Sequence, residues 1–171
     1  MGANVGLCTE IGDDELSLKI RNTLAKEVIE RLLVKQTNGP TNFSVILNFQ
    51  GDRNIFVKNV EREHDFDLSD VTSPLVFLTS LGNDWKKPYK TVLEFVKERK
   101  STLAFNPGTR QLREGHGLVM EVLQEAELLF VNKEEAELLA GEESSEKADQ
   151  EYIEKLTRHL QKIGQLKLVV I

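Results

Sequence analysis

Apolar residues gather in five short runs along the chain, and each run has the length of one strand. Glycine, proline or polar residues separate each run from the adjoining segment, as is usual for strands of a globular domain. The predicted strands cover residues 4–8, 75–78, 102–105, 128–131 and 166–171.

Between these runs, apolar residues recur at every third or fourth position, which is the spacing of an amphipathic helix. The first helix is expected to begin after Asp13 or Asp14, either of which can cap it, and its stripe extends through Val28 to Leu32. Residues 82–84 offer a loop and a cap for the second helix. The further predicted helices cover about residues 86–100, 113–125, 135–140 and 147–163.

Residues 41–60 interrupt this alternation with two β-rich runs, 43–49 and 54–57. Gly51 and Asp52 between them are favourable turn residues, because glycine adopts positive φ without a steric penalty. A hairpin is therefore predicted as an excursion from the main sheet. It could cover a site or serve as an edge or dimer surface, and the sequence does not choose between these roles.

The alternation of strands and helices predicts an α/β fold, with a mostly parallel sheet covered by helices on both faces. A chain of 171 residues can bury a substantial core, and we expect one domain over residues 1–171. A strand begins close to Met1 and another stops at Ile171, so we expect this domain to be incomplete at both ends.

The junction after residue 131 is the first candidate for chemistry, because ligands bind at the carboxyl ends of the strands in open α/β sheets. Asn132 and Glu135 lie three positions apart at a predicted helix start, which is the spacing of a capping box. Spacing alone favours that structural role. A carboxylate and an amide at such an edge can also hold Mg²⁺ through water beside nucleotide phosphates, and the two roles are compatible.

Arg110 follows the Pro107–Gly108 break that ends the strand at 102–105. Its guanidinium could clamp a phosphate at the strand end or pair with Glu114 on the surface, and both alternatives stay open. The sequence contains no P-loop, zinc-ligand spacing or catalytic triad.

The composition of the chain argues against several classes of binding partner. The net charge of −6 gives no basic footprint for a nucleic acid. No apolar run approaches the roughly 20 residues that cross a bilayer, and the N-terminus has no secretory pattern, so we expect no membrane partner and a cytoplasmic location. The single cysteine, Cys8, stands near Leu7 and Ile11 and is expected to be a buried structural thiol.

Residues 132–141, which read NKEEAELLAG, resemble the N-x-x-E segment of the ribokinase-like, or PfkB, carbohydrate kinases. The resemblance covers essentially the whole chain, and it implies a Rossmann-like ribokinase fold with residues 41–60 as a β lid. The other matching pieces occur in the family's order: residues 2–4 leading to 12–14, Thr41 and Asn42 before the hairpin, the strand ending at Ser80, and residues 103–108.

The family transfers the γ-phosphoryl group of ATP to a hydroxyl of a sugar or related small alcohol, and it uses Mg²⁺. The resemblance implies that Asn132 and Glu135 organise Mg²⁺ and the phosphates, with Mg²⁺ held through water, and that Arg110 contacts the nucleotide. It places four residues near the substrate: Asn42, Phe43, Val45 and Ser80.

Two family segments have no counterpart in the sequence. The glycine-rich sugar-binding segment would precede Met1, and the G-A-G-D motif with its aspartate base would follow Ile171, so no catalytic residue is assigned. Because phosphoryl transfer depends on positioning and charge stabilisation, we expect little activity from this chain alone. The alternative is a non-catalytic α/β binding or assembly module that dimerises through the hairpin. The sequence does not identify the acceptor.

Overall fold

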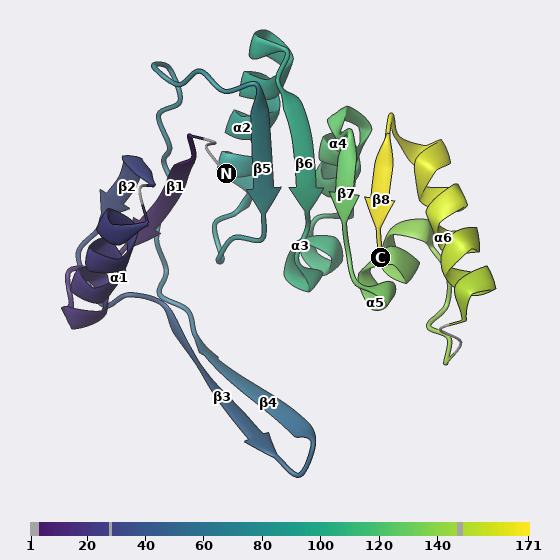
Figure 1. Ribbon diagram of the computed structural model, residues 1–171, viewed down its shortest axis with the longest axis horizontal. Helices are drawn as coiled ribbons and strands as arrows, with labels where there is room; N and C mark the ends of the chain where they lie inside the picture. Colours follow the sequence, from purple (N-terminus) through teal and green to yellow (C-terminus); the bar gives the residue numbers. More distant parts are fainter. Residues whose placement is uncertain (1–3, 28, 147–148) are drawn as a thin grey trace. The chain divides into compact units, whose positions relative to one another are not determined.

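The computed structural model describes residues 4–27, 29–146 and 149–171. The chain divides into two compact units, and each has its own sheet structure (Figure 1). Unit 1 consists of Met1–Asp67 and Gly82–Asp84, and unit 2 consists of Leu68–Leu81 and Trp85–Ile171.

Unit 2 is built on a four-stranded parallel sheet, in which the strands follow their order in the sequence, β5-β6-β7-β8. Helical segments connect each strand to the next (Figure 1). The strands are β5 (Leu75–Thr79), β6 (Thr102–Asn106), β7 (Leu128–Phe130) and β8 (Leu168–Val170). The helices are α2 (Lys86–Arg99), α3 (Thr109–Glu114), α4 (His116–Glu125), α5 (Lys133–Ala140) and α6 (Gln150–Ile163).

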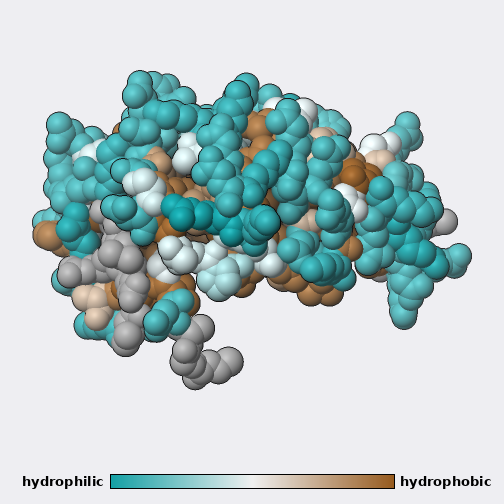
Figure 2. Space-filling model, turned by 90° about the horizontal axis from the view of Figure 1, so that it is seen from above, coloured by the Kyte–Doolittle hydropathy of each residue, from teal (hydrophilic) through white to brown (hydrophobic). Residues whose placement is uncertain are grey.

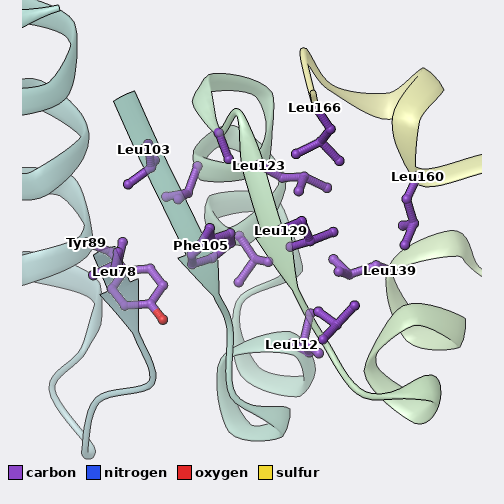
Figure 3. Close-up of a cluster of buried hydrophobic side chains, with 14 of the residues drawn as sticks. Leu78, Tyr89, Leu103, Phe105, Leu112, Leu123, Leu129, Leu139, Leu160 and Leu166 are labelled. Carbon is purple, nitrogen blue, oxygen red and sulfur yellow. The ribbon is translucent and has the colours of Figure 1, made fainter. Parts of the chain in front are cut away.

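The hydrophobic core of unit 2 lies between the sheet and its helices (Figure 3). Leu103, Phe105 and Leu129 of the central strands are completely buried. Trp85 and Tyr89 at the start of α2 are also buried, so they are packing residues and form no stacking platform for a ligand. These contacts are non-local, since they join β6, β7 and α2 into one cluster.

The two edge strands of this sheet carry exposed side chains, whereas the central strands β6 and β7 have none that is fully exposed. Right-handed crossovers between strands in sequential order place their helices on the same face, and Figure 1 shows α2 and α4 together behind the sheet. Most exposed strand residues of unit 2 are apolar, and Figure 2 shows apolar patches between the hydrophilic side chains of the surface. The large exposed apolar side chains on these strands are Leu75, Phe77, Leu168 and Val170.

Unit 1 contains two small sheets. The first pairs β1 (Gly6–Ile11) with β2 (Glu30–Gln36) in parallel, with α1 (Glu15–Lys26) between them in the sequence. The second is the predicted hairpin, β3 (Phe43–Phe49) and β4 (Asp52–Lys58), which is antiparallel. All residues of both hairpin strands are exposed.

The hairpin turns one residue earlier than predicted. Phe49 pairs with Asp52, so that Gln50 and Gly51 form the two-residue loop. Both have positive φ, 50° and 91°, as a type I′ turn requires. The sequence signal for the turn was therefore correct, although its register was wrong by one residue.

Strand β2 is the main element that the sequence did not predict. The helical stripe was expected to continue to Leu32, but α1 ends at Lys26 and Leu32 lies in a strand paired with β1. Val28 lies outside the described residues. A short apolar run fits a helix or a strand equally well, and here the neighbouring strand decides.

Two details of unit 2 also differ from the prediction. The helix expected over residues 113–125 is divided into α3 and α4 at Gly115, in keeping with the low helix propensity of glycine. Helix α2 begins after Trp85 without a side-chain cap, so none of residues 82–84 caps it. Among the described helices, none is both long and apolar enough to cross a membrane.

Candidate active site

Polar side chains connect the carboxyl ends of three strands in unit 2. Thr79 at the end of β5 donates to Oδ1 of Asn106 at 3.4 Å, and Asn106 at the end of β6 donates through Nδ2 to the Phe130 carbonyl of β7. These bonds fix the edge of the sheet at which ligands bind in folds of this kind.

Asn132 and Glu135 form the predicted capping box at the start of α5. Oδ1 of Asn132 accepts from the Glu135 amide at 2.9 Å, and Oε2 of Glu135 accepts from the Asn132 amide at 3.1 Å. Two amides that the helix leaves unpaired are thereby satisfied. The structural role of this pair is confirmed.

Glu135 has another partner that its spacing in the sequence did not reveal. Thr109, the first residue of α3, donates from Oγ1 to Oε1 of Glu135 at 3.3 Å. Glu135 is 8% exposed, whereas Thr109 and Asn132 are exposed. The three residues form a cluster at the carboxyl edge, and only their shared position after strand ends could have predicted it.

The cluster suits an Mg²⁺ ion that keeps its own water. Mg²⁺ commonly takes one or two carboxylates with phosphate oxygens and retains several waters. Each oxygen of Glu135 accepts one hydrogen bond, and a carboxylate offers about four acceptor sites, so that lone pairs remain for metal-bound water. The described residues include no group of three or more His, Cys, Asp or Glu side chains that could hold a metal directly. The cluster therefore fits an Mg²⁺ ion that contacts these residues through its bound water.

Arg110 lies one residue after Thr109 in α3. Its Nε is 3.9 Å from Oε1 of Glu114, and both side chains are about half exposed. This is the surface pair that the sequence allowed as one alternative. At 3.9 Å between two half-exposed side chains this ion pair is weak.

Ser80 lies at the same edge, directly after β5, and is exposed. It packs against Gly108, where an added Cβ would lie 2.6 Å from Cβ of Ser80. The buried Gln111 donates from Nε2 to the Leu81 carbonyl at 2.8 Å. Gln111 is a residue that the sequence did not single out, because its partners are distant in the chain.

The other predicted substrate residues belong to unit 1. Oδ1 of Asn42 accepts from the Val60 amide at 2.8 Å and from Nη1 of Arg62 at 3.0 Å, which closes the base of the hairpin. Phe43 and Val45 on β3 are 42% and 46% exposed. Asn42 therefore has a structural role, and a substrate role for these three residues stays a prediction.

Arg62 is a second residue that no pattern in the sequence singled out. It is 8% exposed and also donates from Nε to Oγ1 of Thr37 at 2.6 Å and from Nη2 to the Pro40 carbonyl. The guanidinium thus joins the end of β2 to both legs of the hairpin.

His64 pairs with a carboxylate that is distant from it in the sequence. Its Nδ1 lies 2.7 Å from Oε2 of Glu10, with side chains that are 10% and 1% exposed.

Burial and, secondly, the charge of Glu10 raise the pKa of the Cys8 thiol to about 11. A thiol with so high a pKa is a poor nucleophile at neutral pH, although Cys8 is only partly buried and not fully buried as expected.

Glu137 of α5 is a buried carboxylate that no pattern in the sequence indicated. Its Oε1 accepts from Nζ of Lys133 at 3.1 Å, the hydroxyl of Tyr152 at 2.9 Å and the Ser145 amide at 3.1 Å. Burial acts to raise the pKa of Glu137, but these hydrogen bonds and the charge of Lys133 outweigh it and hold the pKa below its ordinary value. Glu137 thereby anchors α5 to α6 and to the loop between them.

Comparison with known proteins adds a family and a fold. The model of the pfkB family carbohydrate kinases matches residues 1–171. No curated protein matches the chain.

Three solved structures illustrate the similarity of fold. A 2-dehydro-3-deoxygluconokinase from Thermotoga maritima matches with a TM-score of 0.83 and 16% identity, over 99% of this chain and 57% of that protein. A ribokinase from T. maritima gives 0.67 and 22%, over 96% and 52%. A putative ribokinase II from E. coli, in complex with ATP and Mg²⁺, gives 0.67 and 16%, over 92% and 54%. The chain thus has the ribokinase fold and spans a little over half the length of these proteins.

Proposed function

Because the chain belongs to the pfkB family of carbohydrate kinases, we propose that it forms part of the site of an ATP- and Mg²⁺-dependent kinase. The reaction would transfer the γ-phosphoryl group of ATP to a hydroxyl of a sugar or related small alcohol. The observation that carries this proposal is the cluster of Thr109, Asn132 and Glu135, which brings a buried carboxylate to the ligand-binding edge of the sheet.

In this proposal, Asn132 and Glu135 hold Mg²⁺ through water, and Arg110 turns from Glu114 to the nucleotide phosphates. The bound ion would neutralise charge on the phosphate oxygens. Arg110 would add a planar, doubly donating guanidinium, which matches a phosphate. On the acceptor side, Ser80 would bind a substrate hydroxyl. Asn42, Phe43 and Val45 would contribute from the hairpin of residues 41–60, which would act as the lid.

The capping and metal roles of Glu135 can be separated by substitution. Glutamine also serves at this position of a capping box, so Glu135→Gln keeps the helix start and removes the carboxylate charge. We expect about a 10- to 100-fold higher Mg²⁺ requirement for ATP binding, the usual size of a loss in the shell around a metal. The exposed neighbour Glu134 provides the matched control, Glu134→Gln, for which we expect no change.

ATP binding at varied Mg²⁺, measured by isothermal titration, tests this expectation. An equal Mg²⁺ requirement in Glu135→Gln and the unmodified chain would restrict Glu135 to capping. Acceptor-dependent ADP release by the complete gene product, assayed with ribose, fructose and 2-dehydro-3-deoxygluconate, tests the kinase itself. Absence of both ATP binding and ADP release would favour the non-catalytic binding module.

We also propose that the hairpin mediates a homodimer. The observation in its favour is that both faces of β3 and β4 carry exposed apolar side chains, including Phe49 at 71% and Phe56 at 60%. An isolated two-stranded hairpin is only marginally stable in water, so pairing with a second copy would bury these residues. Sedimentation equilibrium of the chain and of Phe56→Lys tests this: a monomer in both cases would contradict it.

A further inference from the structure

Gln111 is a buried polar residue whose hydrogen bonding is incomplete. Its side chain is 0% exposed, and Nε2 donates to the Leu81 carbonyl at 2.8 Å. Oε1 is also buried and has no hydrogen-bond partner among the described residues. A carbonyl can only accept, so the amide nitrogen must face Leu81, and the orientation of the Gln111 amide is fixed by chemistry.

The unpaired oxygen of Gln111 faces Gly108. A Cβ at position 108 would lie 2.7 Å from Oε1 of Gln111 and 2.6 Å from Cβ of Ser80. Any larger residue would therefore displace either Gln111 or Ser80. Gly108 is thus the point at which the segment after β5 packs directly against the backbone that enters α3.

An apolar residue would fill the position of Gln111 without leaving a buried oxygen unpaired, and unpaired buried polar groups are costly. What glutamine provides here is the single bond to Leu81. That bond fixes Leu81, the residue next to Ser80. The backbone of Gly108 packs closely against the side chain of Ser80. Together they hold the exposed Ser80 at one place on the carboxyl edge.

We propose that Gln111 is a positioning residue that fixes Ser80 for binding a hydroxyl group of the acceptor. The inference rests on the proposed kinase function and deepens its acceptor side. A serine hydroxyl both donates and accepts a hydrogen bond, so a fixed Ser80 selects one hydroxyl of a polyhydroxylated acceptor. Gln111 itself stays buried and does not touch the acceptor.

Two variants loosen this contact by different means. Gln111→Met keeps the length and volume of the side chain and removes the bond to Leu81. Gly108→Ala keeps the glutamine amide but places a methyl group against both Ser80 and Oε1 of Gln111, so that one of the two must move. The matched controls are Gln124→Met, at an exposed glutamine of α4, and Gly117→Ala, where an added Cβ meets nothing within 4 Å.

The first measurement is independent of enzyme activity. Backbone ¹⁵N relaxation of the chain should show the order parameters of Ser80 and Leu81 falling from about 0.85 to below about 0.6 in both variants. The controls should keep the values of the unmodified chain. Rigid Ser80 and Leu81 amides in both variants would overturn the proposal. Two variants are used so that a folding defect in one leaves the other to decide.

The second measurement separates positioning from general structural damage. In the complete gene product, Gln111→Met should raise KM for the accepted sugar about tenfold, the size expected from one lost buried hydrogen bond, and leave KM for ATP unchanged. Equal rises of both KM values, or no rise, would overturn the acceptor role. If the unmodified protein phosphorylates no acceptor, the proposed kinase function is wrong, and the acceptor role of Ser80 and Gln111 is wrong with it. This result differs from a kinase whose KM values do not respond to Gln111→Met, which contradicts the role of Gln111 only.

Discussion

Different kinds of contact stabilise the interior of each of the two units of this chain. Unit 2 has a continuous apolar core in which Phe105, Leu129 and Leu156 are fully buried. Unit 1 relies on polar side chains, since Asp14 and Arg62 each bind several partners around the base of the hairpin. Apolar packing depends on volume and is almost independent of pH, whereas hydrogen-bonded carboxylates depend on their charge. Stability should therefore respond differently in the two units.

The largest difference should come from the core of unit 2. We expect Phe105→Ala to lower the free energy of unfolding by about 3–5 kcal/mol, because it removes a fully buried ring and leaves a cavity. The matched control is Phe49→Ala on β3, where 71% of the side chain is exposed in the single chain. At a protein concentration low enough for a monomer, the expected change is within about 0.5 kcal/mol.

Urea unfolding followed by the fluorescence of Trp85 measures the effect on unit 2, because this is the chain's one tryptophan and it lies in that unit. Equal losses in the two variants would show that the hairpin is buried against a partner in solution. A loss below about 1 kcal/mol for Phe105→Ala would contradict the assignment of Phe105 to a well-packed core.

In unit 1, we expect the next largest effect from Asp14. It caps α1 by accepting from the Ser17 amide at 3.0 Å, and it also accepts from the amide and the hydroxyl of Thr41. A capping residue contributes about 0.5–2 kcal/mol, and Asp14→Ala should reach the top of that range because Thr41 loses its partner too.

Asp149→Ala is the control for Asp14, since the side chain of Asp149 caps α6 by accepting from the Tyr152 amide and, among the described residues, has no bond like that of Asp14 to Thr41. Hydrogen exchange of the amides in α1 and α6 measures the loss of local stability in each helix, and so separates the effect of Asp14→Ala from that of Asp149→Ala. Equal effects would mean that the bonds to Thr41 add nothing to the cap.

Acidification should also distinguish the carboxylates of the two units. Hydrogen bonds from Thr41 hold the pKa of Asp14 below its ordinary value of 3.8, and the pKa of Glu137 is likewise below 4.5. In each case the ionised form favours the folded state, so the contribution is complete at neutral pH and is lost as the pH falls below these ordinary values. Glu137→Gln should therefore reduce the acid sensitivity of unit 2, read by Trp85 fluorescence.

The exposed Glu143 supplies the control for this titration, as Glu143→Gln. Its pH profile should follow that of the unmodified chain. If Glu137→Gln left the loss of stability between pH 5 and pH 3 as steep as before, other carboxylates, such as Glu127 beside Lys167, would be responsible for it.

Local patterns in the sequence were sufficient for most elements of unit 2. The apolar runs at 75–78 and 102–105 became β5 and β6, because each is a short run of apolar residues that proline, glycine or polar residues delimit. The same reasoning failed at β2, where a strand pairs with β1 and its own residues also fit a helix. Prediction was therefore reliable where the residues of a run indicate one kind of element and unreliable where pairing with a neighbour decides.

The candidate site divides in a similar way. The capping box of Asn132 and Glu135 could be predicted, because its partners are three residues apart. The bonds from Thr109 to Glu135 and from Gln111 to Leu81 join residues 26 and 30 positions apart. Such contacts follow from the way parallel strands bring their ends together, and no spacing rule along the chain contains them.

The smallest expected effect comes from a polar contact at the surface of unit 2. Nζ of Lys97 lies 3.3 Å from Oε1 of Glu125, with side chains that are 53% and 38% exposed. Lys97→Met should cost about 0.2–0.5 kcal/mol, and less at high salt. Arg62→Met in unit 1 should cost more, because Arg62 is buried and Thr37, Pro40 and Asn42 would each lose a hydrogen bond from it. Thermal unfolding at low and high salt compares the two. If both variants lost the same small amount, burial would not be what makes the polar contacts of unit 1 important.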